Sequence, residues 1–319
     1  MGEKMKGIIL AAGFGIRMKP LTDRCPKPLL PVLGRPIIDY TISRVKTSGI
    51  KEIGLNICHL ADKMEKFLGD GSRWGVALTL SREPEILGTG GGMGGLRSFL
   101  KGEGPFLVYN GDIASKIELT GLAHYHKEHK PLVTLALCDY PPNNNVSLSP
   151  DNTIVDFLGK GKKFDPVRDR NLTFTGVSIV DEEILNLIPV SGSSHIIDIY
   201  LELIKRQPGS IRGYVVSGDA WRDIGTPAAY LDAQTAILLD HRMGVFGENV
   251  PPGNVYQGQG TWIEPGAVLE GFVSLGEKCL VEKGAFLKNC VVWDNTKVKA
   301  GTRCENGVID GDWQYSLSI

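Results

Sequence analysis

The stretch LAAGFGIRMKPLTDRCPKPLL, residues 10–30, is rich in glycine, proline and positive charge. The run that leads into it, KGIILAA at residues 6–12, has the composition of a buried strand. Gly13 and Gly15 come directly after this run, and glycine allows backbone amides to turn toward an anion. The stretch therefore predicts a strand that leads into a phosphate-binding loop.

Two cations and several prolines complete this loop. Arg17 and Lys27 place fixed positive charge around the glycines. The prolines of the segment are Pro20, Pro26, Pro28 and Pro31. Because proline is poorly accommodated inside a helix, we expect them to hold the loop extended.

The spacing of the glycines argues against two common phosphate-binding motifs. A dinucleotide fingerprint would need a third glycine where Met18 stands, and a Walker loop would need a Gly-Lys-Ser/Thr end. The string Gly-x-Gly-x-Arg-Met-x-Pro-Leu-Thr, followed by Pro-Lys-Pro-Leu, instead resembles the signature of the sugar-1-phosphate nucleotidyltransferases, the nucleoside-diphosphate-sugar pyrophosphorylases. The resemblance covers residues 6–239 for a catalytic domain and residues 260–310 for a tail.

Composition limits the partners and the location. The 319 residues predict a main domain and a smaller one, and a net charge of −1 gives no electrostatic reason to bind nucleic acid or an anionic membrane. Six scattered cysteines without a Cys-x-x-Cys pair favour neither a zinc site nor a disulfide framework, so we expect reduced thiols in a cytoplasm. The N-terminal apolar run is too short for a membrane span or a signal peptide.

Strand-like and helix-like segments alternate beyond the loop. The predicted strands are residues 51–57, 75–80, 105–109, 132–137 and 211–216, and the predicted helices are residues 35–46, 89–100, 119–129, 195–205 and 228–239. This alternation predicts an α/β fold with a doubly wound, mostly parallel, Rossmann-like sheet, whose ligand crevice lies beyond the carboxyl ends of the strands. Strand-like runs within residues 147–180 predict an inserted sheet that covers the site.

The period changes after residue 243. Residues 244–260 predict a linker between a catalytic domain at residues 1–243 and a tail at residues 261–319. Nearly all first positions of successive hexads in the tail are apolar: Trp262, Val268, Ser274, Leu280, Phe286, Val292, Val298 and Cys304. A hexapeptide repeat of this kind predicts a short left-handed parallel β-helix with these positions facing inward. About two and a half coils are too few to stand alone, so we expect packing on the main domain or on a second subunit in a homo-oligomer.

Two aspartates follow strand-like segments. Asp112 comes after the run PFLVYNG, and Asp223 lies in WRDIGTP. Two carboxylates that meet at one crevice suit Mg²⁺ together with phosphate oxygens and water. The resemblance implies that these two aspartates hold the metal, whereas the alternative for each is an ordinary turn or cap aspartate.

The resemblance implies attack by a sugar 1-phosphate on the α-phosphorus of a nucleoside triphosphate, with release of pyrophosphate. Because both reactants are anions, fixed cations must favour their approach, so Arg17 would bind the triphosphate and Lys27 would bridge the reacting phosphates, with Asp112 as the third catalytic residue. Glu83 would read donors on the base edge, or it is a surface glutamate. The nucleotide-binding residues that the resemblance implies are Leu10, Ala11, Ala12, Gly13, Gly15, Glu83, Gly88 and Thr89.

Sugar-phosphate recognition is less complete. The resemblance implies that Asn110, Lys160, Thr175 and Gly176 contact the sugar phosphate. Gly159-Lys160-Gly161 stands where many relatives have Glu-Lys-Pro, so the identity of the sugar stays open. The GTGGG loop and the TFTG strand are similar to the N-acetylmuramate-1-phosphate uridylyltransferases, whereas the tail is similar to many mannose-1-phosphate guanylyltransferases.

The histidines and the retained cations bear on two alternatives. His124, His126 and His129 lie in one predicted helix but not on one face, which favours a solvated helix face over a metal site. The alternative function is a catalytically silent relative that binds sugar nucleotides, and the presence of Arg17 and Lys27 argues against it.

Overall fold

The computed structural model describes residues 5–157, 165, 168–239 and 254–317. The chain divides into two compact units. Unit 1 comprises Met1–Phe14, Thr41–Ile113 and Ile117–Trp221, and unit 2 comprises Gly15–Tyr40, Ala114–Lys116 and Arg222–Ile319. The predicted phosphate-binding loop therefore begins in unit 1 and continues in unit 2.

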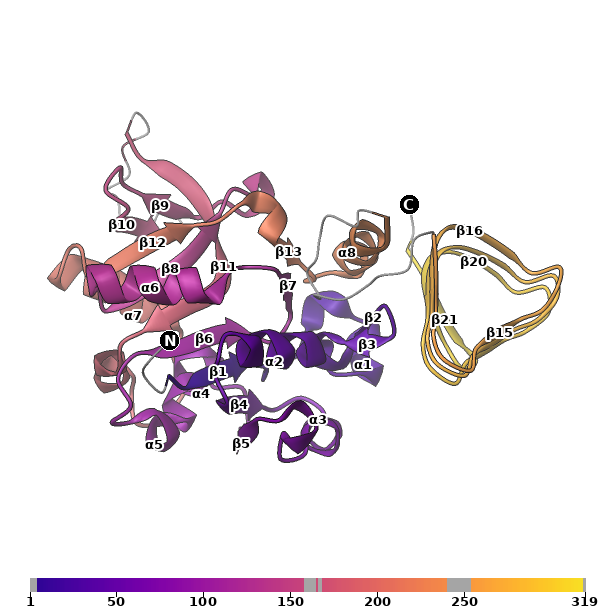
Figure 1. The fold of residues 1–319 in the computed structure, drawn as a ribbon, viewed down its shortest axis with the longest axis horizontal. Coiled ribbons are helices and arrows are strands. Elements are labelled where there is room, and N and C mark those ends of the chain that lie inside the picture. The colour runs from indigo at the N-terminus through magenta and orange to yellow at the C-terminus, as the bar shows by residue number, and fades with distance from the viewer. Residues whose placement is uncertain (1–4, 158–164, 166–167, 240–253, 318–319) are drawn as a thin grey trace. The chain divides into compact units, whose positions relative to one another are not determined.

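A sheet of nine strands, counted over the described residues, forms the centre of unit 1 (Figure 1). The strand β1 (Gly7–Leu10) lies between β4 (Glu52–Ile57) and β6 (Phe106–Asn110) and is parallel to both. The strand β11 (Arg170–Val180) runs antiparallel to β6. The predicted α/β sheet is thus confirmed as a mixed sheet whose larger parallel part is centred on β1.

Helices cover both faces of this sheet. A side chain at Gly7 would point at Val45 of α2 (Ile37–Thr47), whereas Ile8 packs in one cluster with Met93 of α4 (Gly88–Gly95). Because successive residues of a strand face opposite sides, α2 and α4 lie on opposite faces of β1. The sheet is doubly wound, as predicted.

The remaining elements of unit 1 follow the predicted order with shifted ends. They are α3 (Ala61–Leu68), β5 (Ala77–Arg82), α5 (Arg97–Leu100), α6 (Leu119–His129), β8 (Val133–Cys138), β9 (Val146–Leu148), β10 (Ile154–Phe157), α7 (Ile196–Arg206) and β12 (Ile211–Val215). Short 3-10 turns occupy Ser72–Trp74, Pro141–Asn143, Glu182–Leu187 and Gly218–Ala220. A two-stranded pair of β7 (Ile113–Ser115) and β13 (Trp221–Asp223) is separate from the large sheet.

The strands predicted within residues 147–180 are present as β9, β10 and β11. The strand β11 is long enough to pair through Arg170–Leu172 with β9 and through Val177–Val180 with β6. It therefore connects the small antiparallel sheet of β9 and β10 to the main sheet.

The prediction that the histidines lie on a solvated helix face is wrong for His126. Its side chain is 5% exposed, and Nδ1 lies 2.8 Å from Oγ1 of Thr134 on β8. His124 and His129 are exposed. The apolar face of α6 includes Leu122 as well as His126, so the helix buries one polar ring beside its aliphatic residues.

The proline-rich loop of unit 2 is not extended as predicted. It contains a 3-10 turn at Ile16–Met18, the short helix α1 (Leu21–Arg24) and a second 3-10 turn at Lys27–Leu29. The φ angle of proline is fixed near the helical value, so proline suits the first residues of a helical turn. The loop ends in a hairpin of β2 (Pro31–Val32) and β3 (Arg35–Pro36), and α2 begins after Pro36 instead of including it.

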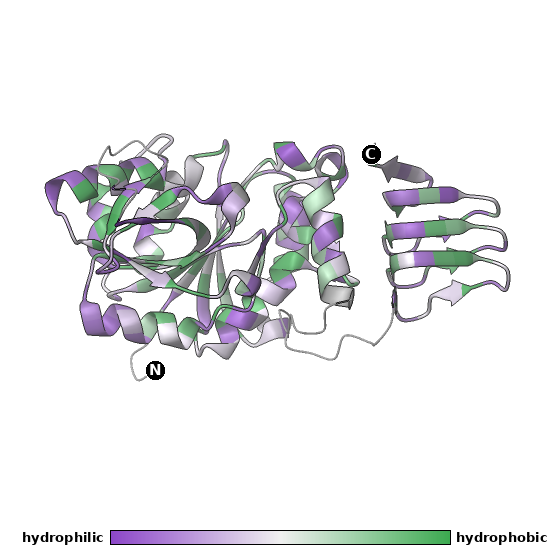
Figure 2. Cartoon of the chain, turned by 90° about the horizontal axis from the view of Figure 1, so that it is seen from above, coloured by the Kyte–Doolittle hydropathy of each residue, from purple (hydrophilic) through white to green (hydrophobic). Residues whose placement is uncertain are grey.

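The tail of unit 2 stacks short strands in successive levels (Figure 2). Trp262 pairs in parallel with Leu280, and Leu280 pairs with Lys297, so successive coils span 18 and then 17 residues. The strands are β14 (Val255–Gln257), β15 (Trp262–Ile263), β16 (Val268–Leu275), β17 (Leu280–Val281), β18 (Phe286–Val292), β19 (Lys297–Val298), β20 (Arg303–Asp310) and β21 (Trp313–Ser316). One sheet has the order β14-β16-β18-β20-β21 and another the order β15-β17-β19. These strands are consistent with the predicted β-helix, whose handedness stays a prediction.

The inward positions of the hexads differ from the prediction. Trp262 is 64% exposed and Val268 is 45% exposed, whereas Val298 and Cys304 are buried. Ile263 instead packs against the tail core and shares its column with Val298. The second coil is one residue shorter than the first. The first positions of the hexads therefore face outward in the first coil and inward in the last.

One outer side of the tail packs on earlier elements of unit 2. Phe272, Val291 and Val308 form one buried cluster with Tyr230 and Leu231 of α8 (Pro227–Leu239). The tail therefore packs on the chain before it, one of the two options expected for so few coils. The predicted linker at residues 244–260 lies partly outside the described residues, and its described end contains β14, which pairs with β16.

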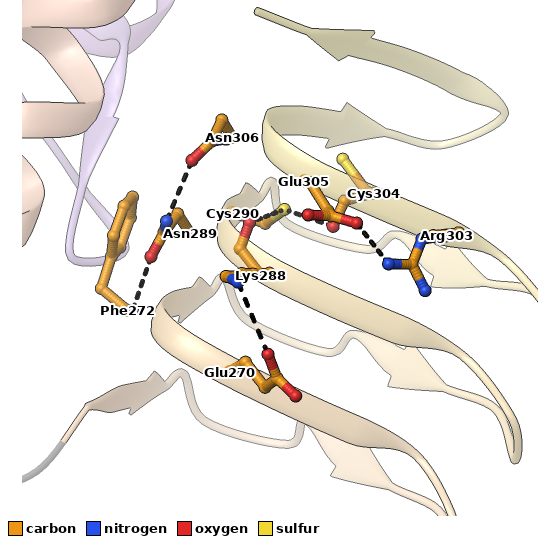
Figure 3. A network of polar contacts seen from close by, with 9 residues as sticks. All are labelled: Glu270, Phe272, Lys288, Asn289, Cys290, Arg303, Cys304, Glu305 and Asn306. Atoms are coloured by element: carbon orange, nitrogen blue, oxygen red, sulfur yellow. Dashed lines mark hydrogen bonds and ion pairs between the residues drawn. The ribbon is translucent and has the colours of Figure 1, made fainter. Parts of the chain in front are cut away.

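Polar contacts connect neighbouring coils (Figure 3). Asn289 Nδ2 donates to Asn306 Oδ1 over 2.9 Å, and Phe272 N donates to Asn289 Oδ1 over 3.2 Å. Inside the coils, Cys290 Sγ donates to the carbonyl oxygen of Cys304 over 3.2 Å. These bonds satisfy backbone and side-chain groups at a corner where the coil changes direction.

Candidate functional site

The carboxyl end of β1 supplies the first part of the site in unit 1. Leu10 ends the strand, and its carbonyl oxygen accepts a hydrogen bond of 2.9 Å from Gly111 N. Ala11 and Ala12 are buried, and Ala11 N donates to Asn56 Oδ1 over 2.8 Å. Gly13 is exposed, with no atom within 4 Å of where a Cβ would stand, so its backbone is open to a ligand.

The glycine-rich segment that opens α4 is tied to the segment before α7. Gly90 N and Gly91 N donate to the carbonyl oxygen of Ser194 over 2.9 and 3.2 Å, and Thr89 Oγ1 accepts from Ile196 N over 3.0 Å. Gly88 has a φ of +75° and precedes these contacts. The Gly88 and Thr89 backbone is therefore held in a defined position.

Asn110 and Gly176 come together where β6 and β11 pair. Gly176 has a φ of +81°, and a Cβ on it would lie 2.5 Å from Asn110 Nδ2, so only glycine permits this approach. Asp112 follows Asn110 by two residues and is half-buried between β6 and β7. The register of β11 with β8 shifts between Phe174 and Ser178, which accounts for the irregular backbone around Gly176.

Thr175 faces into the sheet. Its hydroxyl donates to the carbonyl oxygen of Ala136 over 2.8 Å, and its side chain is 1% exposed. The hydroxyl of Thr175 already has a hydrogen-bond partner. The predicted contact of Thr175 with the sugar phosphate is therefore left to its backbone. Lys160, the predicted phosphate contact, lies outside the described residues.

Gly15 and Lys27 lie together in unit 2. Gly15 has a φ of +61°, and its carbonyl oxygen accepts a hydrogen bond of 2.9 Å from Thr22 Oγ1. A Cβ on Gly15 would lie 2.7 Å from Thr22 Cγ2 and 3.4 Å from Lys27 Cβ. Lys27 is 8% exposed and begins the 3-10 turn Lys27–Leu29, so its aliphatic stem is held against the loop.

Arg17 and Asp223 reach the same place in unit 2. A Cβ on Gly225 would lie 2.8 Å from Arg17 Nη2 and 2.8 Å from each carboxylate oxygen of Asp223. Asp223 ends β13, and Thr226 Oγ1 then accepts from Ala229 N at the start of α8. The guanidinium of Arg17, from the 3-10 turn Ile16–Met18, and the carboxylate of Asp223 therefore both lie beside Gly225 in the turn between β13 and α8.

Glu83 is 5% exposed, and both of its carboxylate oxygens have partners. Oε1 accepts from Asn56 Nδ2 over 2.8 Å, and Oε2 accepts from Leu87 N over 3.0 Å. Sequence reasoning did not identify Asn56 or Gly225. A polar residue within the apolar strand EIGLNI was the available signal for Asn56, whereas no local pattern marks Gly225.

The donor set suits a hard cation. Asp112 and Asp223 offer carboxylate oxygens, the ligands that Mg²⁺ prefers, and both side chains are partly exposed. No group of three or more His, Cys, Asp or Glu side chains arranged for a metal occurs in the described part of the chain. Each aspartate by itself therefore suits a metal that substrate phosphates also bind.

Comparison with known proteins defines the class. The family described as nucleotidyl transferase matches residues 6–239, and the chain belongs to this family. It is an enzyme family, and several curated relatives are sugar-1-phosphate nucleotidyltransferases. No helix in the described ranges is long and apolar enough to cross a membrane.

Individual relatives differ in base and sugar. The chain is 36% identical over 241 residues to N-acetylmuramate alpha-1-phosphate uridylyltransferase of Neisseria meningitidis serogroup B, covering 72% of this chain and 97% of the relative. It is 27% identical over 311 residues to mannose-1-phosphate guanylyltransferase of Mycobacterium tuberculosis, covering 94% of this chain and 82% of the relative. It is 29% identical over 345 residues to UTP–glucose-1-phosphate uridylyltransferase of Synechocystis, covering 96% and 87%.

A solved structure supports the fold. The Bacillus anthracis protein assigned as a glucose-1-phosphate thymidylyltransferase superimposes with a TM-score of 0.61 at 25% identity. The match covers 72% of this chain and 94% of that chain. The shared part is therefore about the length of the family match.

Proposed function

We propose that this protein transfers a nucleoside monophosphate from a nucleoside triphosphate to a sugar 1-phosphate, with release of pyrophosphate. The observation that supports this most is the arrangement of Arg17 and Asp223 over Gly225 within a chain of the nucleotidyl transferase family. A guanidinium binds phosphate oxygens and a carboxylate binds a metal that also binds phosphate. Both groups would act on the same kind of ligand.

The remaining residues divide by unit. Leu10, Ala11, Ala12, Gly13, Gly88 and Thr89 of unit 1 would bind the nucleotide through the backbone. Gly15, Arg17 and Lys27 of unit 2 would bind the triphosphate and stabilise the charge that develops as the sugar phosphate attacks. Asn110, Thr175, Gly176 and Lys160 would bind the sugar phosphate.

The metal in this proposal is Mg²⁺, held by Asp112 and Asp223. When bound, it supplies positive charge next to the triphosphate and so favours loss of pyrophosphate. The two aspartates position it, and Lys27 keeps a second positive charge near the reacting oxygens. A cytoplasmic location, suggested by six free cysteines, and a homo-oligomer formed through the tail belong to the same proposal.

The base and the sugar are the finer part of the proposal. Uridylyl transfer is favoured by the relative from Neisseria meningitidis, and guanylyl transfer by the Mycobacterium tuberculosis relative, whose match includes the tail. These two pairs of substrates are the first to test.

The test measures pyrophosphate release with Mg²⁺ for UTP, GTP, CTP, ATP and dTTP against glucose, mannose and N-acetylmuramate 1-phosphates and phosphocholine. We expect one strong pair, which is lost with a chelator and lowered about 100-fold in kcat by Asp223→Asn. Asp232→Asn, an exposed aspartate on α8, is the matched control and should keep full turnover.

No turnover in any well, together with a thermal shift on adding nucleotide, would instead support the silent sugar-nucleotide-binding relative. Full activity of Asp223→Asn with unchanged Mg²⁺ dependence would remove Asp223 from the metal site.

A further inference from the structure

A buried chain of three hydrogen bonds joins the two loops of unit 1 that the proposed function assigns to the nucleotide. Ala11 N donates to Asn56 Oδ1 over 2.8 Å, and Asn56 Nδ2 donates to Glu83 Oε1 over 2.8 Å. Leu87 N donates to Glu83 Oε2 over 3.0 Å. We call these two side chains the Asn56–Glu83 bridge.

The direction of every bond in the bridge is fixed by its ends. Ala11 and Leu87 both present a backbone N–H, which can only donate. Asn56 must therefore turn its oxygen to Ala11 and its amino group to Glu83, and Glu83 must accept at both oxygens. An amide at one position and a carboxylate at the other satisfies all three bonds, whereas two amides or two carboxylates cannot.

The bridge is enclosed on its remaining sides. Asn56 is 4% exposed and Glu83 is 5% exposed. Asn56 pairs across the sheet with Leu10, and Glu83 N donates to the carbonyl oxygen of Ile57 over 2.8 Å, so both residues are anchored by backbone. A Cβ on Gly92 of α4 would lie 2.3 Å from Asn56 Nδ2 and 3.1 Å from Glu83 Oε1.

We propose that Asn56 and Glu83 are positioning residues that hold the phosphate loop at Ala11 and the nucleoside loop at Leu87 in the geometry that binds the nucleoside triphosphate. In this role Glu83 does not read the base. The inference rests on the proposed function, because it assigns both loops to one nucleotide. It replaces the base-reading role that the family resemblance implied for Glu83.

Exchanging the amide of Asn56 and the carboxylate of Glu83 distinguishes a positioning role of Glu83 from a base-reading role. Glu83→Gln places an amino group against another N–H donor, and Asn56→Asp places two carboxylates against each other. In the double variant the new carboxylate at position 56 accepts from Ala11 N and from the new amide at position 83, whose oxygen accepts from Leu87 N. All three bonds are then satisfied again with the donor and acceptor groups exchanged.

The measurements are kcat and KM for the preferred triphosphate and the thermal unfolding midpoint, for the wild type, both single variants and the double variant. Each single variant should lose about 10- to 100-fold in kcat/KM, mainly through a raised KM, because a buried hydrogen bond to a charged group is broken. The double variant should recover at least about tenfold over either single variant. Glu85→Gln, an exposed glutamate two residues away, is the control and should behave as wild type.

Different results identify the competing role. If Glu83→Gln changes the ratio of kcat/KM among the five triphosphates and the double variant does not recover, Glu83 reads the base and the proposal is overturned. Single variants with wild-type kinetics also overturn it. Amide hydrogen exchange in the wild type without nucleotide adds a test that needs no variant to fold: Ala11 and Leu87 should be protected, and fast exchange at either contradicts the bridge. A wild type that turns over no substrate pair refutes the proposed function, whereas the exchange result still decides the bridge.

Discussion

The burial of His126 changes the pKa of its imidazole. The imidazole lies between α6 and β8, and burial lowers its pKa to about 4, with Asp181 opposing this effect. In the unfolded chain a histidine takes up its proton near pH 6.5. The folded state therefore loses stability as the pH falls from about 6.5 toward 4, and it is unaffected above that window.

We expect His126→Asn to remove this loss, because asparagine keeps a polar atom for Thr134 but does not titrate. The difference amounts to roughly 3 kcal/mol at the acid end of the window, because each pH unit between the two pKa values contributes about 1.36 kcal/mol. Urea unfolding of both proteins between pH 7.5 and 4.5 measures most of it. Parallel stability curves would contradict the buried neutral histidine, and His124→Asn, on the exposed side of α6, is the control.

Individual site residues differ in how far the sequence reveals them. Gly15, Arg17 and Lys27 belong to one short string, so a local pattern is sufficient to place them in one loop. Asn56 is 45 residues from Ala11 in the chain, and only the parallel pairing of β1 with β4 brings them together. A contact of that kind has no local signature.

The helix α4 is the element whose sequence is least like an ordinary helix. It reads GTGGGMGG, and glycine is about 1 kcal/mol less favourable than alanine inside a helix. Its first turns lie against the Asn56–Glu83 bridge and the carbonyl oxygen of Ser194, where a Cβ has no room at Gly90 or Gly92. Close approach of the backbone, and not helix propensity, accounts for these glycines.

We therefore expect Gly92→Ala to be destabilising in spite of the better helix former. The methyl group would lie 2.3 Å from Asn56 Nδ2, and moving Asn56 breaks hydrogen bonds worth more than the gain in propensity. A loss of about 1–2 kcal/mol in the free energy of unfolding and a raised KM for the triphosphate are expected.

Gly94→Ala is the matched control for this helix. Its methyl group would meet only the Cγ2 of Ile188 at 3.2 Å and the carbonyl oxygen of Pro189 at 3.8 Å. A smaller change in stability and an unchanged KM are expected. If Gly92→Ala proves the more stable of the two, α4 does not lie against the bridge.

At the scale of the whole molecule, the tail is part of the core of unit 2. Phe272 is 2% exposed and packs with Tyr230 of α8 in a cluster that also contains Met18 and Leu21 of the signature loop. Removing the tail would expose these apolar side chains. Truncation near residue 244 should therefore destabilise the signature loop and not only change assembly.

Phe272→Ala tests this with a single change. Removing a buried phenylalanine side chain should lower the free energy of unfolding by about 3–5 kcal/mol. Val268→Ala, four residues earlier on the same strand and 45% exposed, should change it by less than about 0.5 kcal/mol. Urea unfolding followed by tryptophan fluorescence measures both, and equal effects would refute the packing of the tail on α8.

Periodicity and local motifs alone determined the order of strands and helices, the glycine- and proline-rich loop that follows the first strand, and the stacking of a repetitive tail. These features depend on residues that are close together in the chain, so the local sequence is sufficient to predict them. The three-dimensional fold decided that β11 joins the main sheet, that His126 is buried, and that the hexad frame shifts between coils of 18 and 17 residues. It also decided that Arg17 and Asp223 both lie beside Gly225 and that Asn56 contacts Glu83, because these arrangements join segments that are distant in the chain and follow from sheet pairing and packing.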